Sequence, residues 1–326
     1  MDVLLTETAA ARFGDRLEDV SLLRMQADGT LLRDGEPVAW DDAAPEVVWA
    51  SADLFDDGAP LRPFFGFLVQ RAEAVRWLQS PAAGVDAPIF ADLLAKGVRL
   101  TTSHVTDVPI AEYVVRAVLD HLQGAGQWRA AQAETQWARH DFREVQGTTW
   151  LVVGLGAIGS AVAVRARAFG ASVLGVRRTP RGDEPVDEVL TPDRLQEALP
   201  RADVVVLSAP ATSATTKLVD DAFLAAMRPG SLLVNIARGA LVDEGALVAA
   251  LDRGTPEHAV LDVTATEPLP DDSPLWTHPR VTLTPHNAAG GTGRYARGAD
   301  LFADNLARYR AGEPLRHEVE ASDLAG

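Results

Sequence analysis

The chain has 326 residues, of which 47% are hydrophobic and 23% charged, so it is long enough for two domains with separate cores. Its formal net charge of −16 repels phosphate backbones and anionic lipid, which argues against nucleic acid and membrane as partners. There is no cysteine, which excludes disulfides, thiolate metal sites and cysteine nucleophiles. Because residues 1–5 also lack a basic region followed by an apolar stretch, we expect a cytoplasmic protein.

The first hundred residues predict a small α/β domain, with strands at 2–5, 47–51, 67–68 and 98–101 and a helix at 69–78. Residues 79–86, Gln-Ser-Pro-Ala-Ala-Gly-Val-Asp, form a turn of small residues. The simplest interpretation is a plain turn, but its backbone amides could also face a ligand. Helices are expected at 109–123 and 127–139, and in the second we expect Trp128 and Trp137 to be core or interface anchors.

From residue 150 onward the pattern changes to a regular alternation of short apolar strands and helices. Strands are expected at 150–153, 172–176, 204–208, 232–235, 259–262 and 281–283. Helices such as 220–227 and 244–252 separate them, and residues 294–310 predict one long final helix. This alternation is typical of a parallel sheet covered by helices on both faces.

Residues 151–159, Leu-Val-Val-Gly-Leu-Gly-Ala-Ile-Gly, contain glycines spaced G-x-G-x-x-G between the first of these strands and a helix expected at 160–169. Gly154 would permit a tight turn, Gly156 would let a pyrophosphate approach the backbone, and Gly159 would let helix and strand pack closely. A glycine-rich turn can also occur in any α/β protein. The order of strand, glycines and helix favours a dinucleotide-binding turn.

Three polar residues follow three different predicted strands at their carboxyl ends, where ligands bind in parallel sheets. They are Arg238, Glu267 and His286. Taken singly, each has a simpler interpretation: Arg238 as a surface charge, Glu267 as a loop residue and His286 as an ordinary polar side chain. Together with the glycine turn they predict an active site. The other six histidines show no paired ligand spacing, so no metal site is expected.

Four segments in order resemble the D-isomer-specific 2-hydroxyacid dehydrogenases, nearest in pattern to the NADPH-dependent glyoxylate/hydroxypyruvate reductases. They are 154–159 (Gly-Leu-Gly-Ala-Ile-Gly), 235–239 (Asn-Ile-Ala-Arg-Gly), 261–269 (Leu-Asp-Val running to Glu-Pro-Leu) and 284–287 (Thr-Pro-His-Asn). The resemblance covers nearly the whole chain. It implies two doubly wound α/β domains, Rossmann-like and flavodoxin-like, with parallel sheets. The dinucleotide-binding domain, residues 102–288, would be inserted into a substrate domain made of residues 1–101 and 289–326.

The resemblance implies hydride transfer between NAD(P)H and a small 2-oxo acid to give a D-2-hydroxy acid. His286 would supply the proton, a task that suits an imidazole near neutral pH, and Glu267 would orient its ring. Arg238 would bind the substrate carboxylate and polarise the carbonyl group, with the backbone of Ala83 and Gly84 as a second hold on the carboxylate. The remaining residues that the resemblance assigns to cofactor binding are Gly154, Gly156, Ala157, Ile158, Gly159, Ser208, Ala209, Pro210, Ala237, Asp262 (to the nicotinamide carboxamide) and His286.

The cofactor prediction depends on the residues that follow the second strand of this domain. NAD-preferring members of the family place an acidic residue there to hold the ribose hydroxyls. Here the residues are Arg177, Arg178 and Thr179, which suit a 2′-phosphate. We therefore expect NADP(H) to be preferred, with NAD(H) possible. A solvated basic edge is the alternative interpretation.

Several alternatives remain open for substrate and function class. Glyoxylate or hydroxypyruvate reduction leads, a phosphoglycerate-type dehydrogenase is the first alternative, and a dinucleotide-sensing scaffold that binds a partner protein with little turnover is the second. Formate and phosphite oxidation are further family variants, of which Glu267 disfavours the formate type. By resemblance we also expect a homodimer formed through the nucleotide domains and residues 128–137.

Overall fold

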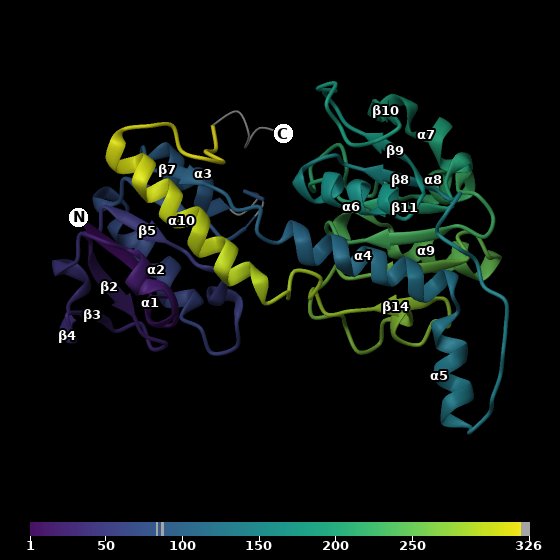
Figure 1. The fold of residues 1–326 in the computed structure, drawn as a ribbon, viewed down its shortest axis with the longest axis horizontal. Helices are drawn as coiled ribbons and strands as arrows, with labels where there is room; N and C mark the ends of the chain where they lie inside the picture. The colour runs from purple at the N-terminus through teal and green to yellow at the C-terminus, as the bar shows by residue number, and fades with distance from the viewer. Residues whose placement is uncertain (83, 86–87, 321–326) are drawn as a thin grey trace. The chain divides into compact units, whose positions relative to one another are not determined.

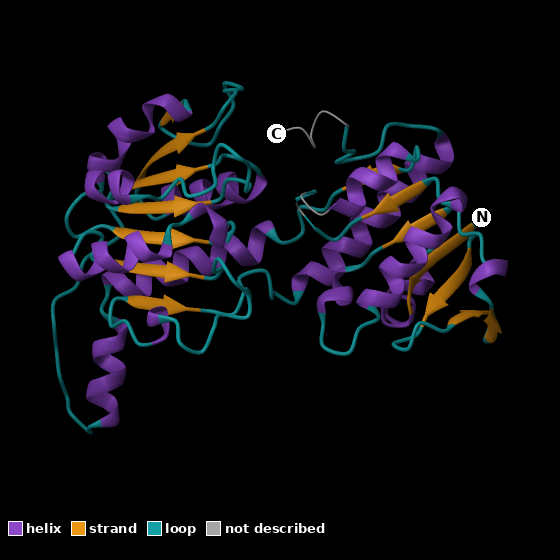
Figure 2. Ribbon diagram, turned by 180° about the vertical axis from the view of Figure 1, so that it is seen from behind, coloured by secondary structure: helices purple, strands orange, loops and turns teal. Residues whose placement is uncertain are grey.

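The computed structural model describes residues 1–82, 84–85 and 88–320, and the chain folds into two compact units. Unit 1 contains Met1–Thr106 and the C-terminal segment that begins at Thr292, and unit 2 contains Asp107–Gly291. Each unit is built on its own seven-stranded sheet (Figure 1, Figure 2). The predicted class of two α/β domains is therefore confirmed.

The sheet of unit 1 has the strand order β4-β3-β2-β1-β5-β6-β7. Its strands are β1 (Asp2–Thr6), β2 (Ser21–Met25), β3 (Leu31–Arg33), β4 (Glu36–Val38), β5 (Val47–Trp49), β6 (Trp77–Gln79) and β7 (Arg99–Thr101). Its helices are α1 (Glu7–Phe13), α2 (Leu61–Arg71), α3 (Pro88–Ala95) and α10 (Gly293–Ala311). The strand order reverses between β1 and β5, which is the arrangement of a doubly wound sheet.

Five strands of unit 1 pair in parallel as predicted, whereas β3 pairs antiparallel with both of its neighbours, β2 and β4. No strand was expected in the β2–β4 segment, although the sequence contains a signal for a hairpin there. Asp34 and Gly35, which join β3 to β4, both have positive φ angles, of 51° and 92°. An Asp-Gly pair in this conformation forms the two-residue turn that suits a β-hairpin.

Unit 2 has a fully parallel sheet with the strand order β10-β9-β8-β11-β12-β13-β14. Its strands are β8 (Thr149–Val153), β9 (Ser172–Val176), β10 (Glu188–Leu190), β11 (Val204–Leu207), β12 (Leu232–Asn235), β13 (His258–Leu261) and β14 (Val281–Leu283). Its helices are α4 (Asp107–Leu122), α5 (Ala125–Ala133), α6 (Ala157–Ala168), α7 (Leu195–Ala198), α8 (Asp221–Ala226) and α9 (Glu244–Arg253). All six strands expected after residue 150 are present, and only the short edge strand β10 was missed.

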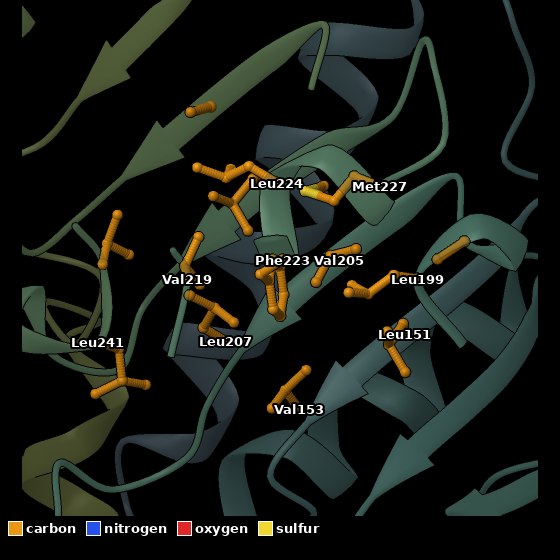
Figure 3. Close-up of a cluster of buried hydrophobic side chains, with 14 of the residues drawn as sticks. Leu151, Val153, Leu199, Val205, Leu207, Val219, Phe223, Leu224, Met227 and Leu241 are labelled. Atoms are coloured by element: carbon orange, nitrogen blue, oxygen red, sulfur yellow. The ribbon is translucent and has the colours of Figure 1, made fainter. Parts of the chain in front are cut away.

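Apolar clusters cover both faces of the unit 2 sheet, as the continuous apolar strands predict. Every residue of β11 and β12 is buried. Figure 3 shows part of one cluster, in which Phe223 of α8 lies among side chains from β8 and β11. Burial of each such side chain contributes about 1.5–3 kcal/mol, so the sheet is a rigid platform for the loops at its carboxyl edge.

The predictions of a strand at 67–68 and a helix at 69–78 are wrong. Residues 67 and 68 lie within α2, and the chain after α2 continues into the buried strand β6. Pro63 lies in the first turn of α2, where a missing backbone N–H is tolerated. Phe64, Phe67 and Leu68 are buried at the spacing of a helix face. The apolar pair at 67–68 therefore belonged to a helical period that began earlier than expected.

Helix α5 and residues 134–143, here called the arm, project from the sheet and helices of unit 2 (Figure 1), and none of these residues is buried. The helix predicted for 127–139 ends at Ala133, and Thr135 has a φ of 57°, which breaks the helical path. Trp137 lies beyond the helix and is 92% exposed, so it is not a core anchor of this chain. The alternative interpretation, that Trp137 is an anchor of a protein interface, stays a prediction. Among the described helices, none combines the length and apolarity that a bilayer crossing requires.

Two histidines have lowered pKa values, from which we expect the folded chain to lose stability in mild acid. Burial and then repulsion from His121 lower the pKa of His258 to about 4, and burial and then His317 lower the pKa of His104 to about 4. In the unfolded chain a histidine has a pKa of about 6.5. Between about pH 4 and 6.5 the unfolded chain binds protons at these histidines and the folded chain does not. The contribution of the two neutral histidines to the free energy of unfolding is therefore full above about pH 6.5 and is lost as pH falls toward 4.

Thermal unfolding followed across this range should show a midpoint that decreases with acidification. Replacing His258 by Gln removes one of the two titrating groups and should make the decrease shallower. A His258→Gln variant with the full wild-type decrease would contradict the assignment.

Candidate active site

The glycine turn lies at the carboxyl end of β8, where the strand order of unit 2 reverses between β8 and β11. Gly154 has a φ of 102°, and a Cβ atom there would lie 2.6 Å from the Ala209 nitrogen. A Cβ atom on Gly159 would lie 2.0 Å from the Gly154 oxygen. These two glycines are thus required by the turn itself.

Gly156 differs from its two neighbours in the motif, because a Cβ atom on it would meet nothing within 4 Å. It precedes α6, and no side chain of the described residues caps the first turn of that helix. Uncapped amides at a helix N-terminus beside open space fit the pyrophosphate of a dinucleotide. Ala157 and Ile158 begin this helix, and their predicted contact with the cofactor stays a prediction.

Ser208 connects the glycine turn to the neighbouring strand. It follows β11, and its hydroxyl donates to the Gly154 oxygen at 2.7 Å. Because Ala209 also packs directly on Gly154, residues 208 and 209 form one wall of the turn. Their predicted contact with a cofactor, and that of the adjoining Pro210, stays a prediction.

Arg238, Glu267 and His286 follow three strands that pair side by side, β12, β13 and β14. The register joins Asn235 to Leu261 and Leu261 to Leu283, so the three carboxyl ends are level. The candidate residues therefore leave the same edge of one sheet, although they are widely separated in the sequence.

Glu267 and His286 form a direct pair. The Glu267 Oε2 atom lies 2.8 Å from His286 Nδ1, and Glu267 Oε1 accepts a hydrogen bond from the Thr264 amide at 3.1 Å. Because a carboxylate only accepts, Nδ1 carries the hydrogen in this pair and Nε2 is left to exchange a proton with a ligand. The His286 side chain is 51% exposed, so Nε2 can be reached.

Asp262 holds the loop that carries His286. Its carboxylate is 3% exposed and accepts hydrogen bonds from the Thr284 hydroxyl at 2.6 Å and from the amides of Asn287 and Ala288 at 2.9 and 3.0 Å. His286 itself has a φ of 50°, and its amide donates to the Asp262 carbonyl oxygen. Positive φ in a non-glycine residue is maintained by such surrounding contacts. This positioning role of Asp262 was missed, and its predicted contact with a carboxamide stays a prediction.

Tyr113 of α4 extends the same network. Its hydroxyl lies 2.6 Å from Thr284 Oγ1, whose hydrogen is already given to Asp262, so Tyr113 is the donor. Burial raises the pKa of Tyr113, which keeps the phenol protonated for this role. Nothing in the sequence of α4 could have indicated this contact, because it depends on how the helix packs on the sheet.

The backbone around Arg238 is fixed by Asn235 and Gly239. The buried Asn235 side chain accepts from the Ala237 amide and donates to the Arg238 carbonyl oxygen, both at 3.0 Å. A Cβ atom on Gly239 would lie 1.9 Å from the carbonyl carbon of Thr264, which belongs to the loop of Glu267. Arg238 and Glu267 are therefore carried by segments in direct contact. The Arg238 side chain is half-buried and its Nη1 donates to the Ala237 oxygen.

The predicted substrate loop belongs to unit 1. Ala83 lies outside the described residues, whereas Gly84 is described and partly exposed. Near this loop the carboxyl ends of β5, β6 and β7 line a small cavity whose walls are Trp49, Ala50, Ala52, Gln79, Ser80, Pro81, Ser103, Val105 and Gly298. The hold of Ala83 and Gly84 on a carboxylate stays a prediction.

The three residues that we expect to contact the 2′-phosphate of the cofactor follow β9 and have different surroundings. Arg178 and Thr179 are exposed. Arg177 is turned toward the glycine turn, where its Nη1 donates to the Leu155 oxygen at 3.0 Å. Its Nε donates to the Thr179 oxygen at 2.8 Å. The sequence placed these arginines at the right strand end but could not show that they point in different directions.

Comparison with known proteins agrees with this geometry. Residues 115–288 match the family model of the D-isomer specific 2-hydroxyacid dehydrogenase, NAD binding domain. The chain is 32% identical over 238 residues to the glyoxylate/hydroxypyruvate reductase A of Serratia proteamaculans, covering 71% of this chain and 75% of the relative. A D-isomer specific 2-hydroxyacid dehydrogenase family protein from Aeromonas salmonicida superposes with a TM-score of 0.78 at 29% identity, covering 98% of both chains.

A second solved structure carries a bound cofactor. The D-isomer specific 2-hydroxyacid dehydrogenase of Xanthobacter autotrophicus, in complex with NADPH and MES, superposes with a TM-score of 0.77 at 27% identity, covering 98% of this chain and 97% of the relative. The chain thus belongs to the D-isomer-specific 2-hydroxyacid dehydrogenase family, as its motifs predicted. It is an NAD(P)-dependent oxidoreductase of that family.

The accessible Nε2 atom of His286 leads to a prediction about the substitution of this residue. Replacing His286 by Ala removes the group that we expect to donate the proton and should reduce kcat by about 10²- to 10⁴-fold. Cofactor binding, measured by fluorescence titration, should change little, since the glycine turn is untouched. His278→Gln serves as a control, because His278 lies just before β14 and His286 just after it, at opposite ends of the strand. A His286→Ala variant that keeps its turnover would remove the assignment.

Proposed function

We propose that this chain reduces a small 2-oxo acid, of the size of glyoxylate or hydroxypyruvate, to the D-2-hydroxy acid with NADPH. The observation that carries the proposal is the Glu267–His286 pair at 2.8 Å, on the strand edge that also bears Arg238. According to this proposal, unit 2 is the dinucleotide-binding domain. Unit 1, with the cavity lined by Ser80 and Pro81, is the substrate domain.

Each residue contributes a separate part of the chemistry. Arg238 presents a planar set of donors that pairs with the substrate carboxylate and polarises the neighbouring carbonyl group. A bound nicotinamide supplies the hydride. His286 gives the proton on Nε2 to the carbonyl oxygen, and the resulting neutral ring remains bonded through Nδ1 to Glu267. This bond fixes the orientation of the ring and leaves Nε2 as the nitrogen that faces the ligand.

The preference for NADPH is supported by the absence of an acidic side chain directly after β9. Arg177, Arg178 and Thr179 stand there instead, and a 2′-phosphate needs local positive groups in a chain of net charge −16. The relative from Xanthobacter autotrophicus was solved with NADPH. NAD(H) remains a possible second cofactor.

The choice of substrate is supported by the Serratia relative, whose name is glyoxylate/hydroxypyruvate reductase A. Phosphoglycerate is the alternative substrate, and a sensing scaffold is the alternative class. A cytoplasmic location is likewise proposed from the cysteine-free composition alone.

A substrate panel with both reduced cofactors tests class, substrate and cofactor together. We expect turnover of glyoxylate or hydroxypyruvate, with kcat/KM for NADPH at least about tenfold above that for NADH, the discrimination of one charged contact. A clear preference for NADH would overturn the cofactor proposal. Tight dinucleotide binding without turnover of any 2-oxo acid would favour the scaffold instead.

We further propose that the arm forms part of a homodimer interface. Trp128 packs against His140 and Phe142, and these rings, together with Trp137, leave aromatic surface exposed on a segment that has no core of its own. Exposed aromatic patches of this kind mark protein interfaces. Arg143 pins the end of the arm by donating to the Gly230 oxygen and to Glu257, both at 3.0 Å.

Light scattering coupled to gel filtration tests this proposal. The wild type should elute as a dimer at about micromolar concentration, and Trp137→Glu should shift it toward the monomer, because a charge cannot be buried there without a partner. Trp276, which is 54% exposed elsewhere in unit 2, provides the matched control variant Trp276→Glu. A monomeric wild type would contradict the proposal.

A further inference from the structure

The connection between β9 and β10 contains an interaction that the predicted cofactor contacts do not explain. This connection, residues 177–187, projects beyond the strands (Figure 1). Arg177 lies at its start, with a side chain that is only 19% exposed. Of the five N–H donors of its guanidinium, two are used by the Leu155 and Thr179 carbonyl oxygens. The others are not engaged by described residues, and the group lies against the glycine turn.

Glu184 lies close to the Nε atom of this guanidinium. Its carboxylate accepts hydrogen bonds from the amides of Arg181 at 2.6 Å and Gly182 at 2.9 Å, and it lies 3.7 Å from Arg177 Nε. Although the connection is at the surface, the Glu184 side chain is only 2% exposed. Hydrogen bonding from the Arg181 amide, ahead of the attraction of Arg177, keeps the pKa of Glu184 below its usual value, so the carboxylate stays charged.

This arrangement folds the connection back on itself. Gly182 has a φ of 87°, which allows the turn that brings two successive amides onto one carboxylate. The turn leaves Arg178 and Arg181 exposed on the same connection. Three arginines are thereby gathered around one short loop whose geometry depends on Glu184.

We propose that Glu184 is the positioning residue for recognition of the 2′-phosphate of NADP(H), because it folds the loop and holds Arg177 over the glycine turn. The inference rests on the proposed NADPH preference. Glu184 is not itself a ligand of the phosphate, since two anions would repel each other. It acts through Arg177 and through the backbone of residues 181 and 182.

Two opposite effects of Glu184 must be weighed. A carboxylate near a phosphate weakens phosphate binding by repulsion, whereas the fold of the loop strengthens it. The repulsion is small here, because the charge of Glu184 is already compensated by two amide donors and by Arg177 at 3.7 Å. Loss of the fold frees a long arginine side chain and a surface loop, whose ordering costs conformational entropy on binding. The positioning effect therefore dominates.

Two variants separate these effects in the full-length chain. Glu184→Gln keeps the shape but removes the charge, and its amide can accept from only one of the two backbone N–H groups. Glu184→Asp keeps the charge but is one methylene too short to hold both. We expect both variants to bind 2′,5′-ADP about 5- to 10-fold more weakly in calorimetry, as for the loss of a charge-assisted contact. Binding of 5′-AMP, which lacks the 2′-phosphate, should be unaffected within about twofold.

Asp183→Asn is the matched control, because Asp183 is an exposed neighbour in the same loop and loses the same charge. It should bind 2′,5′-ADP at least as well as the wild type. In steady-state assays the Glu184 variants should raise KM for NADPH in the same proportion, with a much smaller change in kcat.

The outcomes of these binding measurements distinguish the positioning role of Glu184 from the proposed preference for NADPH. A wild type that binds 5′-AMP as tightly as 2′,5′-ADP would remove the NADP preference and, with it, the role of Glu184. A wild type that prefers 2′,5′-ADP while both Glu184 variants match it would overturn only the positioning role. Tighter binding of 2′,5′-ADP by Glu184→Gln would show that repulsion outweighs the fold and would also overturn it.

Discussion

Parallel pairing of the strands in unit 2 is the constraint on which the candidate site depends. A parallel sheet brings every strand end of one kind to the same edge, and here β8, β9, β11, β12, β13 and β14 all contribute a loop to that edge. The apolar cores on both faces hold the strands in register. Residues that are far apart in the sequence can therefore be placed with the precision that proton transfer requires.

On this platform the polar residues are held in successive layers. The buried Asp262 carboxylate fixes the loop of His286, and Thr284 and Tyr113 in turn fix Asp262. Glu267 then sets which nitrogen of His286 is free. The exposed imidazole is thus the outermost part of a network whose inner part is buried. This arrangement maintains the positive φ of His286 while leaving its Nε2 atom accessible.

Electrostatics impose a second requirement. An acidic chain that handles an anionic substrate and an anionic cofactor must concentrate positive charge locally. Positive side chains follow two of the strands: Arg238 follows β12, and Arg177 and Arg178 follow β9. At the second place an internal carboxylate, Glu184, organises the arginines. A negative residue close to an anion site can therefore support that site through geometry, provided that its own charge is compensated.

The sequence by itself determined the family, the parallel sheet of unit 2 and the glycine turn, and it indicated Arg238, Glu267 and His286 as candidates at the carboxyl ends of neighbouring strands. These follow from local spacing: glycines that only one turn requires, and apolar runs that each end in a polar residue. The sequence did not determine the exposure of Trp137, the carboxylate network of Asp262 or the fold of Glu184 onto Arg177. Each of these depends on which segments meet in three dimensions, and local patterns do not encode such contacts. The tertiary structure alone decided them, because burial and hydrogen-bond partners come from distant parts of the chain.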